Sequence, residues 1–330
     1  MKKICIVLLL IFFCWGCHKG LKHSDREANG KIQVLSSTAM IDDLVGMIGG
    51  EEIDHSSLIQ GNIDPHSYEL VKGDGEKISQ ADVVFYNGLG LEHGASVKNQ
   101  FEKHPRAVAL GDRIYSQKKE AFIFVEGQID PHIWMDVALF SEITLPIAEV
   151  LGEIDPDHAP LFRERAVRLK EKMLMKDQEL FILMQKLPSE QRFLVTSHDA
   201  FHYFTKKYLA NPDEENWEKR LIAPEGLAPD GQMSVLDIKQ VAEFLCEHQV
   251  HVVFPESNIN QDSLKKIVAI CREKGLHVKI AATPLYGDAM AGAKSHLEMI
   301  EHNVQTLIQN LDPGVEQESG NRSSTTHSQL

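Results

Sequence analysis

Short apolar runs alternate with longer amphipathic segments in the first half of the chain. The short runs have the length of buried strands: Ile32–Leu35, Val83–Tyr86 and Ala107–Leu110. The longer segments carry apolar residues at helical spacing: Ala39–Ile48, Ser67–Ser79 and Val137–Leu151. Alternation of this kind predicts a parallel sheet with helices on both faces.

The same alternation returns toward the end of the chain. Three further strands are predicted: Phe193–Thr196, Val250–Phe254 and Val278–Ala282. Three further helices are predicted: Val235–His248, Gln261–Lys274 and Ala289–Leu311. Two such blocks predict an α/β protein of two lobes, each with a parallel sheet flanked by helices.

A long helix is predicted between the two blocks. From Pro160 to Pro188 the chain has no glycine and no further proline, and its apolar residues follow 3,4 spacing with one step missing near Lys176. The pattern predicts one helix of roughly 27 residues, about 40 Å long. An isolated segment with a skip favours packing on its own protein over a coiled-coil partner. Because kinks usually need Pro, Gly or a bulge, we expect this helix to join the lobes rigidly.

The ends of the chain differ from its body. Residues 1–17 have a basic start, a short apolar core and a small-residue end, which is typical of an export leader. Gly16-Cys17 resembles the end of a bacterial lipobox, so lipidation of Cys17 is one outcome, with ordinary cleavage and a retained anchor as the others. We expect a polar tether over 18–30 and a disordered tail over 312–330. Between them we expect lobes at 31–155 and 189–311, joined by a linker helix at 156–188.

Composition narrows the class of protein. Hydrophobic residues make up 43% of the chain, enough for a buried core, and its length suits two domains. The net charge of −14 argues against a nucleic-acid partner. Outside the leader only Cys246 and Cys271 remain, which could pair in an exported protein but do not form a disulfide framework.

The tetrapeptide Ile-Asp-Pro-His occurs twice, ending at His66 and at His132. In each copy the proline fixes the backbone before the histidine and suits the first turn of a helix. Two imidazoles presented in the same way indicate two ligands directed at one point, although incidental histidines on surface loops have the same pattern.

Three polar residues follow predicted strands of the second block: His198, Glu256 and Asp288. In open parallel sheets, ligands bind beyond the carboxyl ends of the strands, although helix caps also occupy these positions. If His198 and Asp288 faced His66 and His132 across a cleft, three imidazoles and one carboxylate would suit a divalent transition metal.

Several motifs together resemble a known family, the TroA-type (cluster A-I) metal-binding proteins, which are the solute-binding components of manganese, zinc and iron ABC importers. The motifs are Asp-Pro-His at 64–66, Gly-Leu-Gly-Leu-Glu-His at 88–93, Asp-Pro-His-Ile-Trp at 130–134, Val-Thr-Ser-His-Asp-Ala-Phe at 195–201 and Leu-Tyr-Gly-Asp at 285–288. The resemblance runs in order over most of residues 31–311. It implies two lobes joined by a long helix, with a metal in the cleft between them.

The resemblance also implies a set of ligands and partners. The metal ligands would be His66, His132, His198 and Asp288, and the bound ion would be the transported Mn, Zn or Fe. The partners would be an ABC permease and its cytoplasmic ATPase, met by a monomer at the outer face of the cytoplasmic membrane. Residues 116–128 lack the histidine-rich loop of many zinc-specific members, which weakens a dedicated zinc function. We expect metal-dependent movement to be confined to the loops bearing His198 and Asp288.

Two other functions fit parts of the sequence. His198 and His202 are four residues apart with Asp199 between them, so they resemble the metal-binding helix of a zinc-dependent hydrolase, in which a glutamate acts as base. Four ligand candidates without a general base favour a carrier over this enzyme, and His93 is expected to support the site without binding metal. Surface adhesion is the third class, although no receptor-binding patch is identified.

Overall fold

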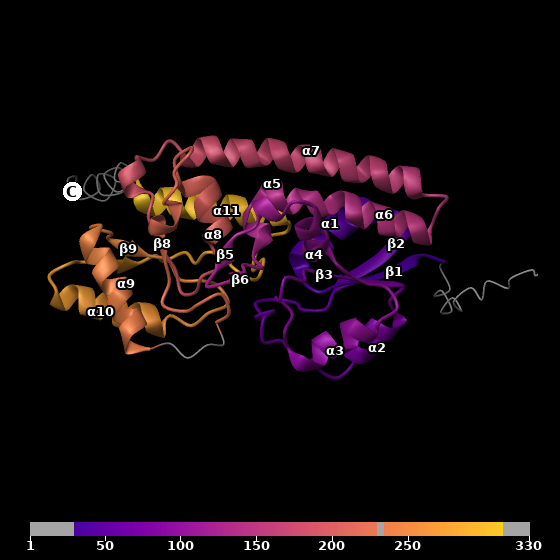
Figure 1. Ribbon diagram of the computed structural model, residues 1–330, viewed down its shortest axis with the longest axis horizontal. Coiled ribbons are helices and arrows are strands. Elements are labelled where there is room, and N and C mark those ends of the chain that lie inside the picture. Colours follow the sequence, from indigo (N-terminus) through magenta and orange to yellow (C-terminus); the bar gives the residue numbers. More distant parts are fainter. Residues whose placement is uncertain (1–29, 230–233, 313–330) are drawn as a thin grey trace, which may run out of the picture.

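A computed structural model describes residues 30–229 and 234–312. The expected leader, nearly all of the tether and all of the tail after Asp312 lie outside the described residues. The rest forms two lobes that lie side by side, with one long helix running along both (Figure 1). Within the described ranges, no helix has the length and apolar character needed to cross a bilayer.

The first lobe contains a four-stranded parallel sheet. Its strands have the order β2-β1-β3-β4, and their bounds are β1 (Ile32–Ser36), β2 (Ile53–Ser57), β3 (Val83–Tyr86) and β4 (Ala107–Ala109). Helices cover both faces, as predicted: α1 (Ala39–Gly49), α2 (Asp74–Gln80), α3 (Ala95–Lys103) and α4 (Leu110–Gln117). Neighbouring residues of β1 point to opposite faces of the sheet. Val34 therefore packs in the hydrophobic core between the sheet and α1, and Leu35 packs in the core between the sheet and helices α2 and α3.

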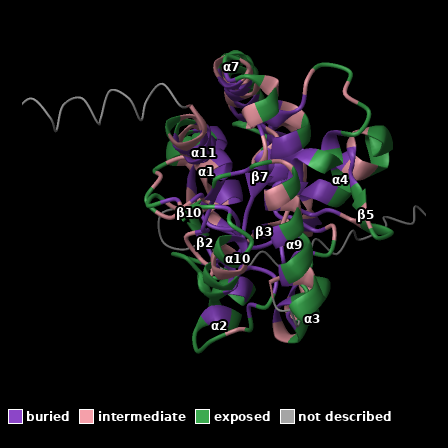
Figure 2. Ribbon diagram, turned by 90° about the vertical axis from the view of Figure 1, so that its left-hand side faces the viewer, coloured by how far each residue is buried: buried purple, intermediate pink, exposed green. Residues whose placement is uncertain are grey.

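The second lobe has shorter strand pairs than the sequence predicts. Strands β7 (Leu194–Val195) and β8 (Leu221–Ile222) form one parallel pair, and β9 (Val252–Val253) and β10 (Lys279–Ile280) form another. The amide of Phe254 donates to the carbonyl of Val195 at 2.8 Å and links the pairs. Helices α9 (Val235–Glu247) and α10 (Asp262–Glu273) pack beside them. Helices such as α2, α3 and α9 have both buried and exposed sides (Figure 2).

Helix α7 (Ala159–Met184) confirms the predicted long helix, with 26 residues. It packs on α1, α5 (Val137–Phe140) and α6 (Thr144–Ile154), and also on α11 (His296–Leu311) and the π-helical turn Thr205–Leu209. Where the 3,4 spacing lacks an apolar residue near Lys176, the helix buries Asp177 instead. The Asp177 carboxylate accepts from Tyr208 Oη at 2.9 Å and pairs with Lys207 Nζ at 2.8 Å. The helix therefore has apolar and polar contacts with both lobes.

Three of the predicted helices differ from the structure. Residues 67–73 are irregular, because the amides of Leu70 and Val71 donate to the side chains of Ser96 and Asp74 instead of to a helical turn. The helix predicted over 137–151 divides into α5, a 3₁₀ turn at Ser141–Ile143 and α6; Pro146 near the start of α6 has no amide to continue the earlier helix.

The predicted final helix is also shorter. Helix α11 begins at His296, where the Ser295 side chain accepts from the amide of Glu298 at 3.2 Å. Ala291 has φ +47°, so the preceding residues do not continue a right-handed helix. The hydrophobic pattern did not predict β2, α3, α4, β8 or the hairpin of β5 (Phe124–Val125) and β6 (Gln128–Ile129). Cys246 and Cys271 are free thiols, not a disulfide.

Polar contacts join the lobes beneath α7. Trp134 Nε1 donates to the carbonyl of Gly287 at 3.0 Å, and Tyr203 Oη donates to the carbonyl of Asp130 at 3.0 Å. The buried His296 donates from Nε2 to the carbonyl of Trp134 at 2.7 Å. Residues 130–134 of the first lobe are therefore held by side chains and backbone of the second.

Candidate metal centre

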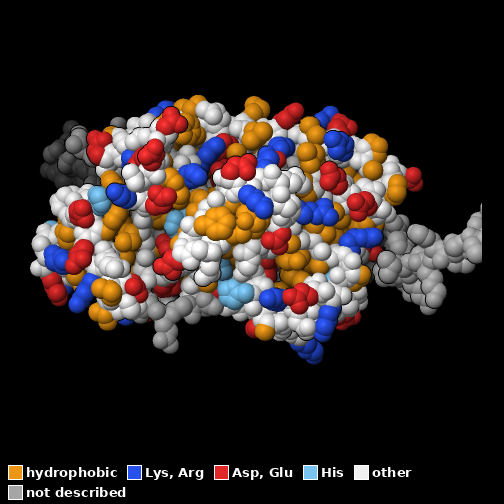
Figure 3. Space-filling view, in the orientation of Figure 1, with side chains coloured by type: hydrophobic (Ala, Val, Ile, Leu, Met, Phe, Trp, Pro, Cys, Tyr) orange, Lys and Arg blue, Asp and Glu red, His pale blue; other side chains and the backbone are white. Residues whose placement is uncertain are grey.

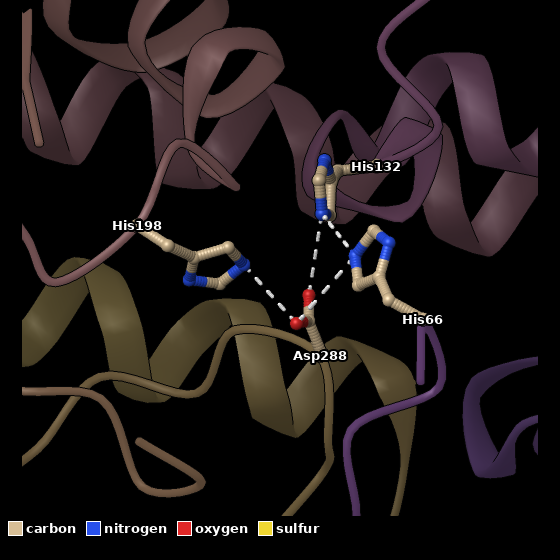
Figure 4. A group of neighbouring side chains, drawn as sticks. All are labelled: His66, His132, His198 and Asp288. Atoms are coloured by element: carbon tan, nitrogen blue, oxygen red, sulfur yellow. Dashed lines mark hydrogen bonds and ion pairs between the residues drawn. The ribbon is translucent and has the colours of Figure 1, made fainter. Parts of the chain in front are cut away.

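Four buried side chains converge where the two lobes meet: His66, His132, His198 and Asp288 (Figure 4). These are the four residues that the sequence and the resemblance singled out. One potential ligand atom from each lies within 4.8 Å of the others. The structure therefore brings together residues that are more than two hundred positions apart in the chain.

The three imidazoles present Nε2 to the carboxylate. Asp288 Oδ2 lies 3.1 Å from His198 Nε2 and 3.8 Å from His66 Nε2, while Oδ1 lies 3.4 Å from His132 Nε2. The Nε2 atoms of His66 and His132 are 3.1 Å apart. When two donor atoms each lie about 2.1 Å from the same metal ion, and the donor–metal–donor angle is about 90° to 110°, the donors are about 3.0 to 3.5 Å apart. Most of these separations therefore fit one metal ion after small side-chain adjustments.

Each residue is presented by a loop beyond a strand or by a tight turn. His198 follows β7 and forms a parallel bridge with Glu225, and Asp288 follows the bridge between Glu256 and Leu285. His132 directly precedes a 3₁₀ turn at Ile133–Met135, close to the helical first turn that we expected. The same expectation is wrong for His66, which is followed by irregular backbone.

The aspartate of the repeated tetrapeptide has a structural role in both copies. Asp64 Oδ1 accepts from the amide of His66 at 2.8 Å, and Asp130 Oδ1 accepts from the amide of His132 at 2.9 Å. Such side-chain turns replace a backbone turn and orient the residue two positions on. The repeat therefore encodes a way of presenting an imidazole.

Two of the imidazoles are also held through their second ring nitrogen. His132 Nδ1 lies 2.6 Å from Asp130 Oδ1, and His198 Nδ1 lies 2.7 Å from Glu256 Oε2. A carboxylate at Nδ1 keeps the proton there and leaves the Nε2 lone pair available to a metal. Glu256 was a candidate from the sequence, whereas Asp130 was not, although its position two residues before a candidate ligand was a signal.

The carboxylates also control protonation. Burial acts to lower the pKa of His132, but Asp130 and Asp288 outweigh it and raise that pKa to about 9. Burial likewise opposes protonation of His198, while Glu256 and Asp288 hold its pKa well above the ordinary value. For His66, burial dominates and lowers the pKa to about 3 despite Asp288. A metal ion that binds these nitrogens must therefore displace protons from His132 and His198.

The remaining histidines lie outside this group. His202 Nδ1 lies 3.2 Å from Asp130 Oδ2, so it contacts the carboxylate behind His132 and not the four converging atoms. The arrangement expected of a hydrolase helix, with His198 and His202 on one metal, is therefore not formed. His93 is exposed, with its ring centroid 5.8 Å from that of His66.

Comparison with known proteins agrees with this geometry. The sequence profile of the ZnuA family, described as the periplasmic zinc-uptake complex component A, matches residues 34–310. Metal-binding protein YtgA of Chlamydia pneumoniae is 39% identical over 289 residues, covering 87% of this chain and 88% of the relative. Manganese-binding lipoprotein MntA of Bacillus subtilis is 31% identical over 312 residues, covering 92% of this chain and 97% of the relative.

Solved structures show the same relationship. The crystal structure of Fe(III)-bound YtgA from Chlamydia trachomatis superposes with a TM-score of 0.81 at 37% identity, covering 86% of this chain and 98% of that one. Profile, relatives and fold agree over nearly all the described residues. The chain therefore belongs to the ZnuA family of TroA-like metal-binding proteins, the substrate-binding components of metal ABC importers.

Proposed function

We propose that His66, His132, His198 and Asp288 bind one divalent transition metal ion, which this protein captures outside the cytoplasm for import. The observation that carries the proposal is the convergence of three Nε2 atoms and one carboxylate in a buried site. Three neutral imidazoles and one carboxylate form a donor set of intermediate softness, which suits Mn²⁺, Fe²⁺ or Zn²⁺. With two imidazoles already oriented by carboxylates, the site needs little reorganisation to bind.

The cargo is proposed to be manganese, zinc or iron. The names of relatives span all three metals: a manganese-binding lipoprotein, a zinc-binding protein and an Fe(III)-bound structure. Of the three divalent ions, Zn²⁺ should bind the isolated protein most tightly, because affinities of nitrogen and oxygen sites rise along the divalent series. Tight binding of Zn²⁺ in solution therefore does not identify the ion carried in the cell.

The proposal extends to partners and location. A carrier delivers its ion to an ABC permease and its cytoplasmic ATPase, acts without catalysis, and works as a monomer at the outer face of the cytoplasmic membrane. Leader 1–17 would direct export, with Cys17 as a lipid anchor. We also propose the division into lobes at 31–155 and 189–311 with the linker at 156–188.

Metal analysis of protein purified from its native host tests the function. We expect about one transition-metal ion per chain, removable by chelation and restored by titration in a calorimeter. Metal should also raise the melting temperature, because a ligand that binds only the folded state stabilises it. Protein that arrives without metal and shows no heat of binding with Mn²⁺, Fe²⁺ or Zn²⁺ would contradict the proposal.

Metal binding is expected to change the overall shape very little. Helix α7 packs on both lobes, and it has no proline or glycine after Pro160 at which to bend. We therefore expect the radius of gyration from small-angle X-ray scattering to agree within error between the chelated and the metal-loaded protein. A clear decrease on adding metal would show that α7 does not brace the lobes.

A further inference from the structure

The three imidazoles of the centre are not held equally. His132 and His198 each have a carboxylate at Nδ1, at 2.6 Å and 2.7 Å. Within the described part of the chain, no carboxylate pairs with Nδ1 of His66. One ring is therefore free to turn about its side-chain bonds at lower cost than the other two.

The backbone around the ligands shows the same difference. Residues 60–67 contain no helix or strand, and most of them are exposed. Among the described residues, their hydrogen bonds other than the His66–His132 contact stay within the segment or reach Ser57. By contrast, the Tyr286 amide and carbonyl before Asp288 both bond to the side chain of Asn303 at 2.8 Å.

The segment that carries His132 is also held from the second lobe. Tyr203 Oη donates to the carbonyl of Asp130, and Trp134 Nε1 donates to the carbonyl of Gly287. The amide of His198 donates to Glu256 Oε1 at 3.0 Å, so one carboxylate orients both the ring and the backbone of this residue. Three of the four candidate ligands are therefore fixed before a metal arrives.

A cavity of about 390 Å³ reaches the centre from the side of His66. Of the four candidate ligands, only His66 lines it. Its other walls come from the hairpin, through Val125 and Gln128, and from both lobes, through His93 and Asp199. On the face drawn in Figure 3, histidine side chains reach the surface near the junction of the lobes. The cavity has space for a hydrated ion, and His66 is the candidate ligand that an ion in it would meet first.

We propose that the metal enters through this cavity to His132, His198 and Asp288, and that His66 binds last and leaves first. Asp130 and Glu256 are positioning residues that keep the rings of His132 and His198 ready. The inference rests on the proposed function and adds an order of events to it. It differs from our expectation from the sequence, which placed movement in the loops of His198 and Asp288.

Cobalt(II) is the probe, because its visible absorption reports the number and type of ligands. His66→Ala should still bind Co²⁺, with an altered spectrum, faster dissociation into a chelator and an association rate within about threefold of wild type. His66→Ala should bind Co²⁺ at least about tenfold more tightly than His132→Ala, because the second variant lacks a ligand that is fixed in place. Equal losses in the two variants would overturn the order of binding. Failure of the wild type itself to bind Co²⁺ would instead remove the proposed function.

The repeated tetrapeptide supplies a matched pair for the positioning role. Asp130→Asn should lower Co²⁺ affinity by about tenfold and slow association, because the asparagine loses the charge that holds the ring of His132. Asp64→Asn removes the same charge from the first copy, where the carboxylate accepts from the His66 amide and the Ser67 hydroxyl but does not contact the ring, and it should change affinity by less than about threefold. Melting temperatures of the metal-free variants separate this effect from unfolding. Equal effects on affinity would contradict the positioning role.

Narrowing the cavity tests the route. Val125→Trp and Gln128→Trp should slow association and dissociation of Co²⁺ by similar factors and leave the dissociation constant nearly unchanged, because an obstructed path alters both directions alike. Val167→Trp, on the partly exposed side of α7, is the control and should alter neither rate. Wild-type rates in both cavity variants would show that the ion takes another path.

Discussion

Replacing Asp288 with alanine is expected to lower Zn²⁺ affinity by about a hundredfold to a thousandfold. Asp288 is the carboxylate of the four-residue group and is 3% exposed, so its loss leaves a divalent ion in a buried site without a negatively charged ligand. Removal of one partner from a buried charge pair typically costs about 3–5 kcal/mol. Its own pKa supports the charged state: burial acts to raise it, but His198 and His132 hold it well below the ordinary value.

Isothermal titration with a competing chelator measures the change for Asp288→Ala. His202→Ala is the matched control, since it removes an imidazole that contacts Asp130 but not the converging atoms. We expect its affinity to stay within about tenfold of wild type, because His202 contacts the carboxylate behind His132 and not the ligand itself, whereas loss of a group that directly supports a ligand typically costs about 10- to 100-fold. If His202→Ala abolished binding while Asp288→Ala did not, the hydrolase-like arrangement would replace the proposed centre.

The second large effect concerns stability and pH. His296 is fully buried, and burial lowers its pKa from 6.5 to about 4, against the opposing bond to the Trp134 carbonyl. The unfolded chain therefore binds this proton more readily than the folded one. The stabilisation from neutral His296 is complete above pH 6.5 and disappears as the pH falls from 6.5 toward 4. A shift of this size corresponds to about 3 kcal/mol of unfolding free energy.

His296→Gln isolates this contribution, because a glutamine amide can still donate to the Trp134 carbonyl but does not titrate. Asp43 accepts from the His296 amide, and burial raises the pKa of Asp43 to about 6, so its proton stabilises the fold as pH falls and partly offsets His296 in the wild type. For each protein, urea unfolding gives the change in unfolding free energy between pH 7 and pH 4.5. Because both proteins contain Asp43, its contribution cancels when the two changes are subtracted. We expect metal-free wild type to lose more stability than the variant; parallel profiles would contradict the assignment.

The fold was largely predictable wherever one periodicity was undisturbed. Helix α7 was expected because a run without glycine or an internal proline has one stable regular conformation and one apolar face. Strand β3 matches its prediction, since a short run of apolar residues buried on both faces has no alternative of similar stability. The helix predicted over residues 67–73 does not form, because backbone amides there donate to the side chains of Ser96 and Asp74. Hydrophobic periodicity carries no information about such side-chain acceptors.

The candidate ligands were predictable for a local reason. Each copy of Ile-Asp-Pro-His contains its own turn, with an aspartate that accepts from the histidine amide two residues later, so presentation of His66 and His132 is written in four consecutive residues. The motifs ending at His198 and Asp288 lie beyond predicted strands, where parallel sheets place their ligands. Sequence alone therefore determined which residue types are available and how each is presented.

The difference between the two copies was decided by tertiary structure alone. Asp64 and Asp130 are equivalent in sequence, yet only Asp130 reaches the ring of its histidine and also contacts His202. Glu256 came to His198 because separate parallel strands end side by side, a contact across 58 positions that no local pattern encodes. Protonation followed the same rule: His66 and His132 share one motif, but burial and neighbouring carboxylates from distant segments move their pKa values in opposite directions. Local sequence sets the turn, whereas the electric environment of a buried group depends on every segment folded around it.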